Sequence, residues 1–176
     1  MPDSDTDMQL LILKQIANNM DAYIYSKDLQ GNYTYVNNNF LQLLQCELTD
    51  IIGKNSEQFF DQETCKIIHK ADQEVFKTEN KTINEHPNCI KDTTQSSTFR
   101  TVKSPIYDEQ GVLIGLCGIS TDITKHKHLQ TIFEEQKQLL HTVLDNVEAH
   151  VYMKNEDRRF LYVNSKVAKS FGLPVS

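Results

Sequence analysis

The chain has 176 residues, 39% of them hydrophobic, and a formal net charge of -6. This length allows one well-packed core with helical extensions. Acidic residues outnumber basic ones by 24 to 18, and no lysine- or arginine-rich run could neutralise a series of phosphates, so direct nucleic-acid binding is not expected.

The start of the chain indicates neither a membrane anchor nor a secretory signal. The aliphatic run Leu10–Leu13 is far shorter than the roughly 20 residues that cross a bilayer. Residues 1–7 are acidic, whereas a signal peptide begins with positive charge. Four cysteines lie far apart without a Cys-x-x-Cys motif, which is typical of reduced thiols. We therefore expect a cytoplasmic segment without membrane contact.

Residues 1–20 are expected to form an amphipathic N-terminal helix, because apolar residues recur at helical spacing from Met8 to Asn19. This helix either covers its own domain or pairs with a second subunit. Two aromatic, β-branched runs, 22–26 and 33–36, flank a turn that contains Gly31 and predict a β-hairpin. Asn37 is a plausible cap for the short helical segments that follow.

The segment 62–78 has the clearest helical periodicity of the chain. Its predicted inner face includes Ile68 and Phe76, and also the polar residues His69 and Asp72. Three further strands are expected at 82–90, 97–105 and 112–121. Together these elements predict an α+β domain at 21–124, a five-stranded antiparallel sheet with helices on one face.

Residues 125–147 are polar and free of glycine and proline, and they predict one long helix. Positions on one face alternate steps of four and three residues, which is typical of a coiled-coil seam. The helix could instead fold back on its own domain. The seam comprises Leu129, Phe133, Gln136, Leu140, Val143 and Val147.

An internal repeat relates the two ends of the chain. Residues 16–40 recur as 143–167 at a constant offset of 127, with seven identities in 25 aligned positions. A period this long indicates tandem domains rather than a solenoid. We therefore expect 148–176 to be the truncated start of a second domain, cut within its first helix, and to pack irregularly or against a partner chain.

Four segments of residues 16–124 resemble the PAS domain, the sensory module of bacterial signalling proteins. They are the hairpin 28–37, the segment 50–54, the helix end 72–78 and the run 115–124, which ends in Asp122, Ile123 and Thr124. The resemblance implies a small-ligand or cofactor pocket in the sheet and dimers formed through the flanking helices. It also implies signal relay through Asp122, Ile123 and Thr124 to downstream domains.

A haem or a flavin could occupy such a pocket in this family. Haem-binding sensors similar to this family ligate iron from a histidine on the long internal helix, and His69 and Phe76 have the corresponding spacing of seven residues. A histidine that is simply satisfied by Asp72 or by backbone is the alternative. Flavin is not expected, because Asn88 and Cys89 follow Pro87 in the strand region and lack the flavin motif.

The remaining candidate residues concern ligand binding and relay. Arg100 alternates with Phe99 and Thr101 in its strand, and could clamp a carboxylate if it points inward or be solvated if it points outward. Asp122 can cap the following helix. The predicted ligand pocket comprises Ile68, His69, Asp72, Phe76, Arg100 and Cys117.

The resulting prediction is a cytoplasmic, dimeric sensory module, either vestigial or able to bind an unidentified small molecule, that is not itself an enzyme. Its relay would act on another PAS domain and on an output domain, either a histidine kinase or a cyclic-di-GMP enzyme. Two alternatives remain open. One is a haem-based gas or redox sensor that uses His69 as the metal ligand, and the other is a structural dimerisation module without a ligand.

Overall fold

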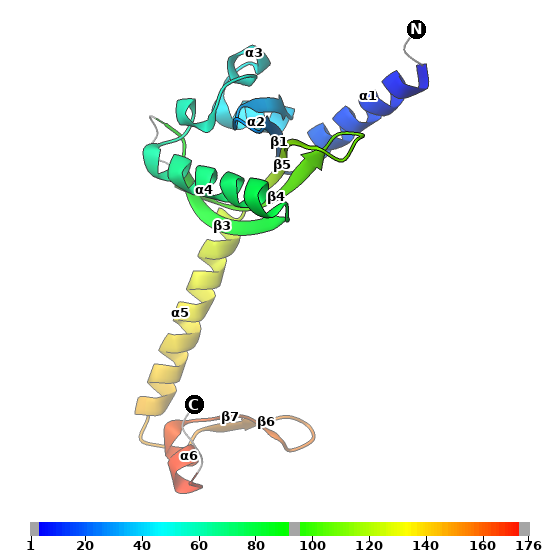
Figure 1. Ribbon diagram of the computed structural model, residues 1–176. Coiled ribbons are helices and arrows are strands. Elements are labelled where there is room, and N and C mark those ends of the chain that lie inside the picture. Colours follow the sequence, from blue (N-terminus) through cyan, green and yellow to red (C-terminus); the bar gives the residue numbers. More distant parts are fainter. Residues whose placement is uncertain (1–3, 92–95, 173–176) are drawn as a thin grey trace. The chain divides into compact units, whose positions relative to one another are not determined.

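The computed structural model describes residues 4–91 and 96–172 (Figure 1). The chain divides into two compact units, Met1–Lys125 and His126–Ser176. The N-terminal unit contains a five-stranded sheet, and the C-terminal unit contains a two-stranded one.

All pairings in the five-stranded sheet are antiparallel, and its strand order is β2-β1-β5-β4-β3. The α+β fold class predicted from the sequence is thereby confirmed. The strands are β1 (Tyr23–Asp28), β2 (Tyr33–Val36), β3 (Thr82–Cys89), β4 (Ser96–Tyr107) and β5 (Leu113–Asp122). The helices of this unit are α1 (Ser4–Asn19), α2 (Asn38–Leu44), α3 (Leu48–Ile51), the short 3-10 helix η1 (Ser56–Gln58) and α4 (Gln62–Thr78).

Helices α2 to α4 lie over one face of the sheet (Figure 1). Helix α4 packs against β3, β4 and β5, while α2 packs against β1. The hydrophobic core lies between these helices and the sheet and includes Tyr25, Tyr33, Phe40, Ile51, Ile68, Val75 and Leu116. Burial of these apolar side chains is the main stabilising contribution.

The β1–β2 turn is stabilised by local contacts. The Asp28 carboxylate accepts hydrogen bonds from the backbone N–H groups of Gln30 and Asn32, at 3.0 and 2.8 Å. Gly31 has a φ of 83°, in the left-handed region that favours glycine. After the hairpin, the Asn37 side chain caps α2 by accepting from Phe40 N–H, as the sequence predicted.

Gly118 of β5 leaves room for the Tyr25 ring of the neighbouring strand. A Cβ atom at Gly118 would lie 2.2 Å from Tyr25 Cζ, which is closer than van der Waals contact permits. The absence of a side chain at this position therefore brings a core aromatic ring directly against the β5 backbone.

The C-terminal unit contains most of α5 (Thr124–Asn146), followed by β6 (Tyr152–Lys154), β7 (Phe160–Val163) and α6 (Ser165–Ser170). β6 and β7 pair as an antiparallel hairpin whose register shifts between Met153 and Lys154, so this part of 148–176 has defined secondary structure. Packing of this segment against a partner chain stays a prediction. That this hairpin belongs to a second PAS domain stays a prediction. The apolar side chains of the predicted seam are exposed, from 39% at Val147, directly after the end of α5, to 69% at Phe133.

Candidate functional site

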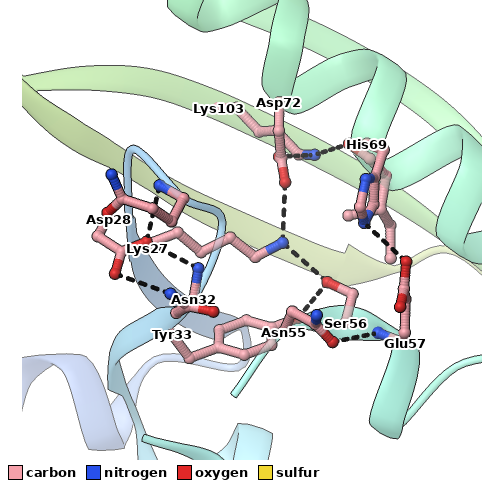
Figure 2. Close-up of polar contacts among 12 residues, drawn as sticks. Lys27, Asp28, Asn32, Tyr33, Asn55, Ser56, Glu57, His69, Asp72 and Lys103 are labelled. Carbon is pink, nitrogen blue, oxygen red and sulfur yellow. Dashed lines mark hydrogen bonds and ion pairs between the residues drawn. The ribbon is translucent and has the colours of Figure 1, made fainter. Parts of the chain in front are cut away.

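A buried charge cluster lies between α4 and the sheet. The Asp72 carboxylate of α4 accepts hydrogen bonds from two lysines, one on each oxygen (Figure 2). Lys27 Nζ of β1 lies 2.8 Å from Oδ2, and Lys103 Nζ of β4 bonds to Oδ1. The lysine side chains are 1% and 2% exposed, so the three ionisable groups interact away from solvent.

Further contacts hold both ammonium groups in place. Lys27 donates to Ser56 Oγ at 2.8 Å, and its Nζ lies 4.8 Å from the centre of the Tyr33 ring, a cation–π distance. Ser56 Oγ also lies 3.1 Å from the Tyr33 hydroxyl. Lys103 donates to the Ile68 carbonyl oxygen at 3.1 Å. The cluster thus connects β1, β2, η1, α4 and β4.

The electrostatics of the cluster are unbalanced, because it contains two lysines and only one aspartate. Burial lowers the pKa of Lys103, and the nearby Asp72 carboxylate offsets part of this effect. Burial also raises the pKa of Tyr33, and raises that of Tyr25 well above its ordinary value, with the negative Asp72 adding to the shift. Both phenols are therefore neutral at physiological pH.

Strand and helix periodicity place these groups at one level of the core. Tyr25 and Lys27 alternate inward along β1, and Phe99, Thr101 and Lys103 do so along β4. On α4, Cys65, Ile68, Asp72 and Val75 follow steps of three and four residues and form the buried stripe. Asp72 is the charged member of this stripe, opposite the two lysines.

A chamber of about 20 Å³ lies beside the cluster. This volume exceeds the roughly 10–15 Å³ that one water molecule needs. Thr101 and Ser120 face each other in its wall, with their hydroxyl oxygens 2.8 Å apart. Asn88 Oδ1 is buried and has no hydrogen-bond partner among the described residues. The chamber is lined by Tyr25, Tyr33, Phe40, Phe60, Ile68, His86, Asn88, Thr101, Lys103 and Ser120.

The residues predicted for the ligand pocket are only partly brought together. Ile68 lines the chamber, and Asp72 forms the centre of the adjoining charge cluster. Phe76 is half-buried and packs against the hydrophobic core, while Cys117 is a half-buried free thiol. Neither of these two residues lines the chamber.

The prediction that His69 faces inward is wrong. Its side chain is 52% exposed, and its Nε2 lies 3.9 Å from Glu57 Oε1, also at the surface (Figure 2). Successive residues of a helix differ by about 100° in direction, so Ile68 and Asp72 occupy the inner face and His69 points away from it. Inward orientation of Arg100 is likewise wrong, since its side chain is 52% exposed and lies 4.0 Å from Glu85.

The chamber does not fit a haem ligated by His69, because the histidine lies outside it and its volume of about 20 Å³ could not enclose a porphyrin. His69 instead lines a separate pocket of about 700 Å³ beside α4, together with Glu57, Phe60, Cys65 and Lys91. Within residues 4–91 and 96–172, no group of three or more His, Cys, Asp or Glu side chains could hold a metal ion. Over the same ranges, no helix is long and apolar enough to cross a bilayer.

Sequence reasoning missed the importance of Lys27 and Lys103. Each lysine lies two residues beyond an inward-facing residue of the same strand, Tyr25 in β1 and Thr101 in β4. This period of two is the signal that could have identified them as inward-facing. A charged residue in an apolar register requires a buried partner, and Asp72 supplies it.

Asp122, Ile123 and Thr124, the residues predicted for signal relay, form a bonded junction between β5, β4 and α5. Thr124 Oγ1 donates to the Asp122 carboxylate and accepts from Thr98 N–H of β4 at 2.8 Å. Ile123 N–H donates to the Thr98 carbonyl at 2.8 Å. The Asp122 carboxylate also accepts from Thr124 N–H, which satisfies one of the free N–H groups at the start of the helix.

Comparison with known proteins relates the chain to signalling proteins. A diguanylate cyclase of Vibrio cholerae is 31% identical over 137 residues, which are 77% of this chain and 42% of that protein. The methanogenesis regulatory histidine kinase FilI of Methanothrix harundinacea is 30% identical over 119 residues, or 66% of this chain and 13% of that protein. The chain therefore spans less than half the length of these two relatives.

The fold itself is shared with a PAS domain from Colwellia psychrerythraea. That crystal structure superimposes with a TM-score of 0.57 at 22% identity, and covers 66% of this chain and 98% of its own. The family model described as the PAS fold matches residues 17–128, which include the whole five-stranded sheet and the charge cluster. The chain therefore belongs to the PAS fold family.

Proposed function

We propose that this chain is a cytoplasmic sensory module that converts the state of its chamber into a change at the start of α5. A change in the core can alter α5 only if the two are energetically coupled. The observation that supports this coupling best is the bonded junction at Asp122, Ile123 and Thr124, because α5 begins directly within it.

One face of β5 leads from the chamber to this junction. Gly118 contacts the Tyr25 ring, Ser120 lines the chamber, and Asp122 follows at the next position of the same alternation. A displacement of Tyr25 or Ser120 would therefore act on the strand whose last residue bonds to Thr124. Strand β4 provides a second route, since Thr101 lines the chamber and Thr98 bonds to Thr124.

The exposed seam of α5 supports a dimer as the assembly through which the signal acts. Apolar residues at four- and three-residue steps along one face of a helix are suited to pairing with a second helix of the same kind. The names of the relatives support a histidine kinase or a cyclic-di-GMP enzyme as the output. The chain itself acts in this proposal as a regulator, and the repeat at 143–167 as the start of a second PAS domain.

Hydrogen–deuterium exchange on the purified chain tests the coupling. We expect Ser120→Ala in the chamber to change exchange at the first amides of α5, and we expect this change to disappear in an Asp122→Ala background. Thr121→Ala is the matched control, because this neighbouring side chain is exposed on the other face of β5. If Ser120→Ala alters α5 equally with and without Asp122, the proposed relay role of Asp122 is wrong.

A second candidate is a dimerisation module without a ligand. The chamber volume of about 20 Å³ favours it, because this space is close to that of one water molecule. In that case the charge cluster would serve only to orient α4 on the sheet. Binding measurements on the chamber distinguish the two functions.

A further inference from the structure

The chamber adjoins an excess of buried positive charge. Among the described residues, the buried lysine and aspartate side chains are Lys27, Lys103 and Asp72, which leave one positive charge uncompensated. A buried charge without a counter-charge is strongly unfavourable. Lys103 lines the chamber, so the uncompensated charge borders on the space that a ligand would occupy.

Two hydrogen-bonding groups at the chamber have unused capacity. Asn88 is 8% exposed, and its Oδ1 atom accepts no hydrogen bond from the described residues. Buried amide oxygens are nearly always satisfied, so a missing donor is expected here. Lys103 Nζ has two acceptors, Asp72 Oδ1 and the Ile68 carbonyl, for its three N–H groups.

Resting on the sensory function proposed above, we propose that the chamber binds a small monoanion that also carries one hydrogen-bond donor, such as a short 2-hydroxy carboxylate. Its negative group compensates the Lys27, Asp72 and Lys103 cluster and accepts from Lys103. Its hydroxyl group donates to Asn88 Oδ1. The ligand thereby satisfies both the charge and the unpartnered acceptor at the chamber.

The position of β3 allows such a ligand to enter. β3 is the edge strand of the sheet, next to β4, and it contributes His86 and Asn88 to the chamber wall. An edge strand has fewer backbone bonds to break than a central one. In this proposal β3 moves outward to admit the ligand, and the bonds that hold its C-terminal end, from Cys89 N–H to Thr64 Oγ1 and from Asp61 N–H to the Cys89 carbonyl, have to open.

Calorimetric titration of the purified chain tests the ligand class with three probes at constant ionic strength. Glycolate has the charge and the hydroxyl donor, acetate lacks the donor, and glycolamide lacks the charge. We expect glycolate to bind roughly tenfold more tightly than acetate, as one satisfied buried hydrogen bond implies. Glycolamide is expected to bind more than tenfold more weakly than glycolate, because its contact to Lys103 is not charge-assisted on both sides.

Two variants assign this binding to the chamber. Lys103→Met keeps the Lys27–Asp72 ion pair but removes the excess charge, and should abolish glycolate binding. Arg100→Met is its matched control on the exposed side of β4 and should bind as wild type does. Asn88→Ala should make glycolate and acetate bind equally, and it provides a separate readout if Lys103→Met fails to fold, which circular dichroism will show.

The proposal is overturned if glycolate binds no better than chloride, if glycolamide binds as tightly as glycolate, or if Asn88→Ala keeps the preference for glycolate. These outcomes are distinct from failure of the sensory function. The exchange experiment on Asp122 tests the relay without any ligand. A coupled α5 without glycolate binding would refute the ligand class alone, whereas glycolate binding without coupling would refute the relay alone.

Discussion

The hairpins β1–β2 and β6–β7 have the same local structure but very different surroundings. In the first, the Asn37 side chain donates to the carbonyls of Ala17 and Ala22. In the second, Asn164 donates to Leu144 and Ala149, which are the equivalent residues at the offset of 127. Each asparagine also accepts from two backbone N–H groups. Hairpin geometry is therefore encoded within about 25 residues.

The two turns also correspond, although their residues differ. Asn155 replaces Asp28 and accepts from Arg159 N–H at 2.8 Å, as Asp28 does from Asn32 N–H. Arg158 replaces Gly31 and has a φ of 65°, in the left-handed region where a side chain is strained. The hydrogen-bond pattern of the hairpin is thus retained at an energetic cost in the second copy.

The two hairpins differ in how deeply their side chains are buried. Tyr25 and Tyr33 are 6% and 2% exposed, whereas the equivalent Tyr152 and Phe160 are 57% and 55% exposed. Both lysines lie over an aromatic ring, Lys27 at 4.8 Å from Tyr33 and Lys154 at 4.4 Å from Phe160. Only Lys27 is buried, with Asp72 and Ser56 as partners. Lys27 is thus buried by contacts with α4 and η1, which lie outside its own hairpin.

Removal of the Asp72 charge should produce the largest difference in stability between the units that contain the two hairpins. Asp72→Asn leaves two buried ammonium groups without an anion, and we expect a loss of about 3–5 kcal/mol in the free energy of unfolding of the N-terminal unit. Urea denaturation measures it, with Glu74→Gln on the exposed face of α4 as the control. Exchange at β6 and β7 should stay unchanged. A loss below about 1 kcal/mol would contradict the role of Asp72 as the counter-charge of the two lysines.

Substitution of the two capping asparagines tests whether the same set of hydrogen bonds contributes equally to stability in the two hairpins. Asn37→Ala removes the partners of four backbone groups in a buried region, and we expect a loss on the order of 3 kcal/mol. Asn164→Ala removes the same four bonds, but it should accelerate amide exchange only in the C-terminal unit and leave unfolding of the five-stranded sheet unchanged. Global destabilisation by Asn164→Ala would contradict the independence of the two units.

Gly118→Ala tests the contact between β5 and the Tyr25 ring. The added methyl group would overlap the ring, so we expect a loss of about 1–3 kcal/mol in thermal unfolding. Gly111→Ala is the control for backbone strain alone, because its φ is 79° and no atom lies within 4 Å of an added Cβ. Rescue of Gly118→Ala by Tyr25→Phe would show that the Tyr25 hydroxyl, rather than the ring, causes the clash.

The smallest effect concerns alkaline pH. Tyr25 has a folded-state pKa raised above its ordinary value of 10.0, so between these two values the unfolded chain loses a proton that the folded chain keeps. The contribution of Tyr25 to the free energy of unfolding is therefore fully present below pH 10. Above pH 10 the free energy of unfolding falls, by at most about 1.4 kcal/mol per pH unit for one group. Tyr33 acts in the same direction.

Lys103 acts in the opposite direction, because its pKa is lowered from 10.5 and its contribution to stability rises with pH only up to that value. The dependence of the free energy of unfolding on pH should therefore be measured within about one pH unit above 10.5. Tyr25→Phe should make the fall in the free energy of unfolding shallower. An equal slope in wild type and Tyr25→Phe would show that Tyr25 ionises in the folded protein.

Local patterns in the sequence determined most of the architecture. The bounds 62–78 of α4 agree with its amphipathic period, and the hairpin at Gly31, the Asn37 cap and the repeat at 143–167 were all readable from neighbouring residues. The physical reason is that capping, turn geometry and amphipathic spacing depend on residues a few positions apart. The PAS family was recognised separately, from the resemblance of four segments within residues 16–124.

Only the tertiary structure decided which polar residues form the site. Lys27 and Lys103 are 45 and 31 residues from Asp72 in sequence, so no local pattern could pair them. The orientation of His69 depended on a rotation of about 100° between neighbouring residues at the edge of the buried stripe, which spacing alone could not resolve. Burial of a charge is a property of all the elements that surround it: Lys27 is enclosed by η1, α4 and the five-stranded sheet, whereas Lys154, at the corresponding position of β6, is exposed.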